Sequence, residues 1–129
     1  MFETRTLSIV PDDIAPDGSQ IRLISVLMAG GSMVQCTLKP GQITQAVQHR
    51  TVAEAWLCIS GNGRLWRSQD ENHETIHLTP GTGASIPDGT RFQFRNDGDI
   101  PLEIVIATFP SWPGVSEAIQ CEGEWAPNV

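Results

Sequence analysis

Turn-forming residues recur so often along this chain that no long helix fits between them. Glycine and proline permit or preset the backbone angles of tight turns, and they cluster at residues 29–32, 39–42, 61–63, 79–83, 87–90 and 96–99. The stretches between these clusters are short and rich in apolar residues, several of them β-branched. Short apolar stretches separated by regularly spaced turns are typical of a sandwich or barrel, so we predict an all-β fold.

The individual strands follow from the apolar stretches. They are predicted over residues 21–27, 33–38, 45–49, 54–60, 64–67, 74–78, 84–86, 91–95 and 102–109. The sequence Gly61-Asn62-Gly63 predicts a β-hairpin between two of them, and residues 69–73 predict a polar loop. Residues 102–109 are the most continuously apolar, which predicts a central strand buried on both faces.

The length of the chain indicates one domain. A chain of 129 residues fits a single domain, which we place at residues 1–129 with its barrel core at about residues 20–109. The N-terminal segment through Ser19 and the tail from Pro110 onward show no clear periodicity and are predicted to be irregular.

The tail nevertheless carries two large apolar rings. Trp112 and Trp125 lie in it, and a free tail would rarely contain such side chains. We therefore expect the tail to pack onto the barrel. A short helix over residues 115–120 is an additional, weaker prediction.

The balance of charge excludes one class of partner. The chain has 8 Lys and Arg against 15 Asp and Glu, for a net charge of −7. Recognition of a phosphate backbone depends on basic residues that displace counterions. We therefore expect no nucleic-acid partner.

The cysteines and the apolar runs bear on location. Cys36, Cys58 and Cys121 are an odd number with no paired metal-type spacing. The first residues do not resemble a signal peptide, and no apolar run is long enough to span a membrane. The expectation is a reduced, cytoplasmic location with no membrane partner.

Two sets of spaced residues carry a resemblance to a known family. The first has the form G-x5-H-x-H-x3-4-E-x6-G and runs from Gly41 to Gly61, with His49 and Glu54 in register. Val47 stands at the first histidine position. This pattern resembles the first motif of the cupin superfamily.

The second cupin motif has the form G-x5-P-x-G-x2-H-x3-N. Gly81, Pro87, Gly89 and Asn96 match it, whereas Phe92 stands at the histidine position. The chain thus resembles small single-domain cupins of the cupin-2 type. The resemblance implies a double-stranded β-helix, or jelly-roll, barrel with an irregular N-terminal segment and C-terminal tail.

The same resemblance bears on metal binding. In metal-binding cupins three histidines and one glutamate hold a divalent ion such as Fe, Mn, Ni or Zn, which implies His49 and Glu54 as ligands if a metal is bound. Val47 and Phe92 have no lone pair to donate, and catalytic zinc sites typically use three protein ligands. We therefore expect no resident cofactor. Other candidates for a third ligand are Gln45, Gln48 and His77.

His49 and Glu54 are also the candidate catalytic residues. Glu54 shares its parity with Trp56, so it is expected on the apolar inner face of a strand, where a carboxylate needs a partner. His49 is the obvious partner, and pairing would favour the imidazolium and carboxylate forms together. Such a pair can act as general acid and base, or it can be purely structural.

Further residues are candidates for contact with a ligand. The expected cavity-lining side chains are Val47, Trp56, Trp66, Phe92 and Phe94, and the expected cations at the barrel mouth are Arg64 and Arg91. The alternative is that the aromatic residues are ordinary core and that the arginines are solvated surface charges.

Three functions remain open at this point. The preferred one is a metal-poor module that binds a small, apolar or aromatic molecule inside the barrel. The second is a cupin enzyme, an isomerase, epimerase or metal-dependent oxygenase, that acts on a small organic substrate. The third is a structural or regulatory scaffold. By resemblance and because of exposed sheet edges, the chain is expected to form a homodimer.

Overall fold

The computed structural model describes residues 2–129, and it is built almost entirely of extended chain. Within these residues there are eleven strands and one turn of 3-10 helix, η1 (Val115–Glu117). The strands are β1 (Asp13–Ile14), β2 (Gln20–Ser25), β3 (Ser32–Leu38), β4 (Val47–His49), β5 (Ala53–Ser60), β6 (Gly63–Gln69), β7 (Asn72–Leu78), β8 (Gly83–Ile86), β9 (Arg91–Asn96), β10 (Leu102–Phe109) and β11 (Ala118–Gln120). The predicted all-β fold is confirmed.

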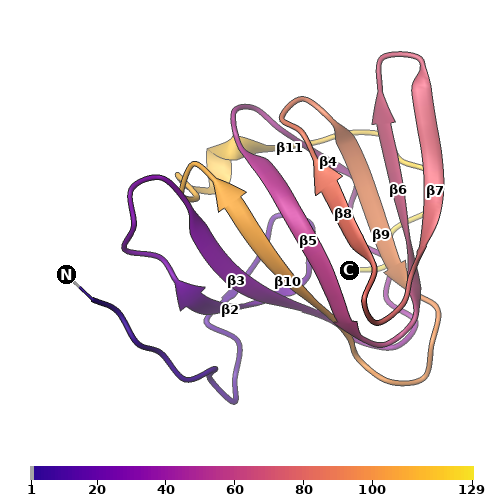
Figure 1. Cartoon of the computed structure of the whole chain (residues 1–129). Helices are drawn as coiled ribbons and strands as arrows, with labels where there is room; N and C mark the ends of the chain where they lie inside the picture. Colours follow the sequence, from indigo (N-terminus) through magenta and orange to yellow (C-terminus); the bar gives the residue numbers. More distant parts are fainter. Residues whose placement is uncertain (1) are drawn as a thin grey trace.

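The strands form two antiparallel sheets that face each other (Figure 1). The six-stranded sheet has the order β1-β2-β3-β10-β5-β8, and the five-stranded sheet has the order β11-β4-β9-β6-β7. Strands that are distant in sequence are therefore neighbours, as in a jelly roll. No helix among residues 2–129 is long and apolar enough to cross a membrane.

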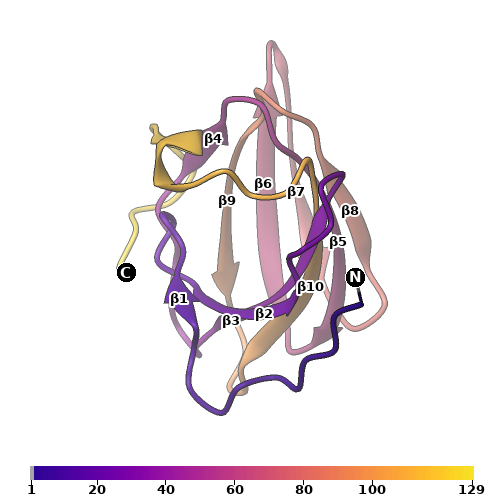
Figure 2. The same ribbon diagram turned by 90° about the vertical axis from the view of Figure 1, so that its left-hand side faces the viewer.

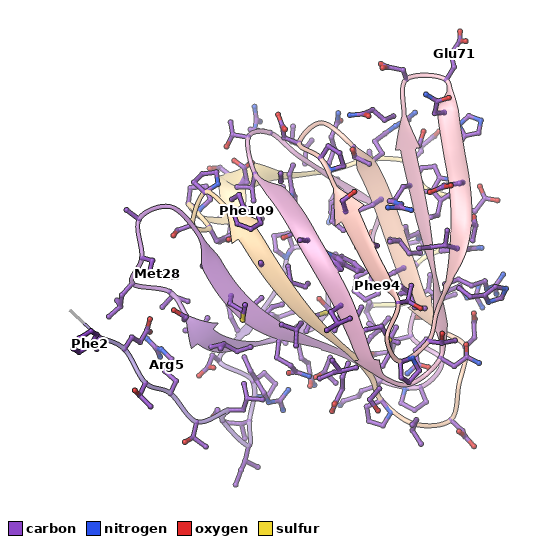
Figure 3. All side chains as sticks on the ribbon, in the orientation of Figure 1. Phe2, Arg5, Met28, Glu71, Phe94 and Phe109 are labelled. Carbon is purple, nitrogen blue, oxygen red and sulfur yellow. The ribbon has the colours of Figure 1, made fainter. Side chains whose placement is uncertain are left out.

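The core lies between the two sheets and follows from the period of two along each strand. On β5 the side chains of Glu54, Trp56 and Cys58 point inward, while the residues between them are more exposed. Phe94 of β9, labelled in Figure 3, is buried, and its ring meets the Trp56 ring edge-on at a centroid distance of 5.0 Å. Inward-facing apolar residues from both sheets together form one core.

The predicted hairpin at Gly61 and Gly63 is wrong, because the two strands that it would join lie in different sheets. β5 pairs with β10 and β8, whereas β6 pairs with β9 and β7. The glycines allow the chain to cross between sheets at close quarters. A Cβ on Gly63 would lie 2.1 Å from the carbonyl oxygen of Arg95, and Gly61 has a φ of 92°.

A tight hairpin joins β6 to β7. Gln69 pairs with Asn72, so the connection is two residues long, with Asp70 at a φ of 55° and Glu71 at the tip (Figure 3). The predicted loop over residues 69–73 is therefore too long.

Strand β10 is central, as predicted, since it lies between β3 and β5. The prediction of burial on both faces is wrong. Leu102, Ile104 and Ile106 are buried in the core, but the alternate residues are only half-buried. The continuous apolar run gives the outer face of this sheet an apolar character instead.

The tail packs onto the barrel as expected. Trp125 lies under the guanidinium groups of Arg64 and Arg95, at 5.4 Å and 5.3 Å from the ring centroid. The side chain of Gln93 accepts a hydrogen bond from the Trp125 backbone nitrogen and donates one to its carbonyl oxygen. These contacts fix the tail along the outer face of the five-stranded sheet.

The weaker prediction of a helix over residues 115–120 is wrong. Only one 3-10 turn forms, and Ala118–Gln120 then becomes β11, which pairs with β4. The edge of β4 offers unpaired backbone groups, so pairing there satisfies more of the tail's backbone than one further helical turn would.

Candidate functional site

A cavity of about 300 Å³ lies between the two sheets at one end of the barrel. Its walls come from inward-facing residues of β2, β3, β4, β5, β9 and β10. Its rim comes from residues 13–17 and from residues between Ser111 and Ala118. Figure 2 shows β1 and the segment that follows β10 on the same side of the two sheets. The cavity is thus enclosed by the strands and bordered by both terminal segments.

His49 lies in this cavity on the short strand β4. It is 5% exposed, and its ring makes edge contacts with the rings of Phe92 and Trp112 at centroid distances of 5.1 Å and 4.9 Å. Its Nδ1 atom is buried and has no hydrogen-bond partner among residues 2–129. Burial lowers the pKa of His49, although the charge of Glu117 and the backbone of Val52 act in the opposite direction, so the net shift favours the neutral imidazole.

Glu54 faces the same cavity from β5. Its Oε1 accepts a hydrogen bond of 2.9 Å from Nε1 of Trp56. Burial raises the pKa of Glu54 to about 7; the Trp56 hydrogen bond opposes this effect and the nearby charge of Asp17 adds to it. The side chain is therefore an acid that exchanges its proton near neutral pH.

The expected imidazolium–carboxylate pair is not what the geometry supports. Nδ1 of His49 lies 4.0 Å from Oε2 of Glu54, which is beyond hydrogen-bond distance. Burial moves the two pKa values toward the neutral forms of both groups. The cost of removing two charges from water outweighs their attraction at this distance.

Asp17 is a second buried acid that the sequence reasoning missed. It precedes β2 in the sequence Pro16-Asp17-Gly18-Ser19, and its Oδ1 accepts hydrogen bonds from the Ser19 backbone nitrogen and hydroxyl group at 2.9 and 2.7 Å. Burial raises the pKa of Asp17. The turn is held by Gly18, whose φ is 97°. The sequence Pro-Asp-Gly-Ser is typical of a turn, so the turn could have been predicted. The direction of the Asp17 side chain depends on the tertiary fold and could not.

Trp112 is also a wall residue that the sequence placed only in a packed tail. The segment that carries it is anchored by Glu117, which is 5% exposed. The Glu117 carboxylate accepts hydrogen bonds from the backbone nitrogens of Thr51 and Val52 and from the Thr51 hydroxyl group. These bonds fasten the segment to the β4–β5 connection. Burial acts to raise the pKa of Glu117, but these hydrogen bonds outweigh it and help to lower that pKa.

The structure brings together five of the residues predicted for the site. These are Val47, His49, Glu54, Trp56 and Phe92, all of which line the cavity. Their roles in binding or catalysis stay predictions. The other four predicted residues lie outside the cavity lining.

The two remaining aromatic residues have structural positions. Phe94 is fully buried in the core beyond Trp56. Trp66 lies on the opposite face of β6 from the core residue Leu65, and it pairs with Gln93 across the sheet. The alternation of β6 therefore directs Trp66 away from the cavity.

The two arginines expected at the mouth also point elsewhere. Arg64 forms a two-bond ion pair with Asp97 at 2.6 and 3.2 Å and lies over Trp125. Arg91 alternates with the inward-facing Phe92 and is exposed. Neither side chain lines the cavity.

The donor set does not fit the metal that the family pattern implies. His49 and Glu54 are two of four expected ligands, and Phe92 fills space beside the His49 ring. Among residues 2–129, no group of three or more His, Cys, Asp and Glu side chains has an arrangement that holds a metal. We therefore derive no step through a metal ion.

The alternative third ligands are engaged elsewhere. Gln45 donates to the carbonyl oxygen of Val129 at 2.8 Å, and Gln48 donates to that of Gly89 at 2.8 Å. His77 is exposed on the edge strand β7. None of the three lines the cavity.

Two antiparallel sheets that enclose a pocket define the class of small ligand-enclosing jelly-roll barrels. The model of the Cupin_2 family, described as a cupin domain, matches residues 34–108. This chain therefore belongs to the cupin family. The family assignment expected from the two motifs is confirmed.

Solved structures share the fold of this chain. CapF, a capsular polysaccharide assembling protein from Staphylococcus aureus, has a TM-score of 0.75 at 18% identity over 93% of this chain and 35% of that one. An uncharacterized Klebsiella pneumoniae protein with a double-stranded β-helix domain has a TM-score of 0.68 at 20% identity over 94% of this chain and 100% of that one. These likenesses show the fold.

A curated relative is the mannose-1-phosphate guanylyltransferase of Klebsiella pneumoniae. It is 28% identical over 89 residues, which are 69% of this chain and 18% of the relative. The chain thus spans less than a fifth of the length of the curated relatives it matches.

Proposed function

We propose that this cupin binds a small organic molecule in the cavity between its sheets. The observation that carries the proposal is the buried Nδ1 of His49, which has no partner among residues 2–129 although it borders a cavity. A buried polar atom without a partner costs free energy, and a ligand group or a water can supply one. The cavity volume of about 300 Å³ is at the small end of the range for ligand sites.

The similarity to the guanylyltransferase does not support the same reaction in this chain. The match covers 18% of that protein. In addition, no Lys or Arg of residues 2–129 lines the cavity. Phosphate groups are bound mainly by such cations, so a sugar phosphate is a poor fit.

Proton transfer is a second candidate function. Glu54, with its pKa raised to about 7, lies beside a neutral imidazole, and such groups work as general acid and base near neutral pH. Once a ligand is known, exchange of its carbon-bound hydrogen in D₂O should be seen by NMR and should be lost in Glu54→Gln. Exchange that continues unchanged in this variant would remove Glu54 from the mechanism.

A ligand screen tests the binding proposal. Thermal shift with a chemically diverse set of neutral, cationic and anionic compounds should give hits with wild type. Val34→Phe, which fills the cavity from β3, should abolish them. Thr75→Phe adds an aromatic ring to the exposed face of β7, away from the cavity, and should retain them. A screen without hits, or hits that survive Val34→Phe, would contradict binding at this site.

Location and assembly are also proposed. Cys36, Cys58 and Cys121 are all unpaired within residues 2–129, which supports a reduced cytoplasmic location. A homodimer is supported by apolar side chains on the outer face of the six-stranded sheet, such as Leu57 and Met33.

A further inference from the structure

Apart from His49, the ionisable side chains that line the cavity are all acidic. Asp13, Asp17 and Glu54 line it, together with His49, and no Lys or Arg of residues 2–129 does so. An anionic ligand would therefore meet only acidic or neutral groups. Burying its charge there without a cation would be costly.

The two deep acids each keep one oxygen free of protein hydrogen bonds. Asp17 uses Oδ1 for both bonds from Ser19, and Glu54 uses Oε1 for the bond from Trp56. No hydrogen bond from residues 2–129 reaches Oδ2 of Asp17 or Oε2 of Glu54. Both carboxyl groups line the same cavity.

Aromatic rings and the unpartnered histidine complete the surroundings. Trp56, Phe92 and Trp112 line the cavity, with Trp56 and Phe92 in edge contact at 5.8 Å. Aromatic faces attract organic cations. His49 is only 5% exposed. Its Nδ1 has no partner among residues 2–129, so it can accept a hydrogen bond from a ligand group in the same cavity or donate one to it.

We propose that the cavity is selective for an apolar organic monocation, a primary or secondary amine on a small aromatic or branched aliphatic body. The ammonium group donates hydrogen bonds to Asp17 and Glu54, and the apolar body lies against the aromatic and aliphatic walls. This inference rests on the proposed function, because it names the ligand class of the same cavity. It accounts for two buried acids that no Lys or Arg among residues 2–129 neutralises within the cavity.

Three probes of one shape test the charge directly. Calorimetry at pH 7.5 with the full chain would compare 2-phenylethylamine, 2-phenylethanol and phenylacetate. The amine should bind at least about tenfold more tightly than the alcohol, as a charge-assisted hydrogen bond predicts, and phenylacetate should not bind. A carboxylate that binds, or an alcohol that binds as tightly as the amine, would overturn the inference.

A pair of variants locates the effect. Asp17→Asn should weaken amine binding at least fivefold and leave alcohol binding nearly unchanged. Asp88→Asn removes the same charge from an exposed turn outside the cavity lining and should change neither. Equal loss of amine binding in both variants would reduce the effect to net charge and contradict the assignment of Asp17. Should Asp17→Asn fail to fold, the three-probe comparison with wild type still decides.

The outcomes separate this inference from the proposed function. If the wider screen yields neutral or anionic ligands that Val34→Phe abolishes while no amine binds, the charge inference is wrong and small-molecule binding stands. If neither the amines nor any other compound binds, both fail.

Discussion

Glu54 and Asp17 place two carboxyl groups where water is scarce, and this position has a consequence for stability. An acid whose pKa is raised by folding holds its proton in the native state after the unfolded chain has released it. The unfolded state then gains stability relative to the native state as the pH rises through that interval. The two residues therefore make the protein less stable at pH 8 than at pH 5, other groups being equal.

Glu54→Gln should flatten this dependence. The native pKa is about 7 against 4.5 for the free side chain, so the loss from Glu54 begins near pH 4.5 and is complete just above pH 7. The full loss is about 3 kcal/mol, and most of it falls between pH 5 and pH 8. Urea denaturation at pH 5 and pH 8 should show that the variant gains stability relative to wild type at pH 8. Glu103→Gln, on the outer face of β10, is the matched control. An identical pH difference in wild type and Glu54→Gln would show that Glu54 ionises normally.

At the scale of single residues, the sequence predicted the inward direction of His49, Glu54 and Trp56 but not their protonation, and it wrongly expected Trp66 in the cavity. The period of two indicated which residues share a face, and the family motif indicated which face points inward. Their neutral forms depend on depth of burial and on a 4.0 Å separation, which only the assembled barrel defines. Asp17 lies in a turn outside any periodic segment, so no strand pattern indicated where its side chain points.

Among the elements, the connection from β5 to β6 was correctly predicted to be a turn, but the two strands were wrongly predicted to pair with each other. Glycine on either side of an asparagine is typical of a hairpin. The same residues also allow a strand to leave one sheet and enter the other where backbones pass closely. Strand positions followed from local pattern, whereas the choice between these two connections depends on pairing with β9 and β10, far along the chain.

Gly63→Ala tests how closely the backbone of the β5–β6 connection approaches that of β9. The added Cβ would overlap the carbonyl oxygen of Arg95, which belongs to a paired strand and cannot move freely. A loss of about 3 kcal/mol in the free energy of unfolding is expected. Gly30→Ala, whose Cβ would meet no atom within 4 Å, should change stability by less than about 0.5 kcal/mol. Similar, small effects in both variants would mean that the passage is looser than described.

For the whole molecule, the outer face of the six-stranded sheet supports the proposed homodimer. Leu57 pairs with Val105 across β5 and β10, and Ala107 pairs with Met33 across β10 and β3, so these residues share that face. Leu57 and Met33 are exposed in the single chain. A second copy related by a twofold axis would cover the patch with the same patch, which is the simplest closed arrangement.

Leu57→Glu should therefore shift the protein toward monomer. Light scattering coupled to size exclusion should give twice the chain mass for wild type and one chain mass for the variant. Thr75→Glu places the same charge on the exposed face of β7 and should leave the dimer intact. A wild-type monomer at high concentration would contradict the dimer proposal.

The tryptophans of this chain divide into two optical environments. Trp56 and Trp112 line the cavity, whereas Trp66 and Trp125 lie on the outer face of the five-stranded sheet. A double replacement, Trp66→Phe with Trp125→Phe, would leave only the two cavity indoles to fluoresce. The intensity and wavelength of their emission would then report the polarity of the cavity interior, so its filling could be followed without any attached dye.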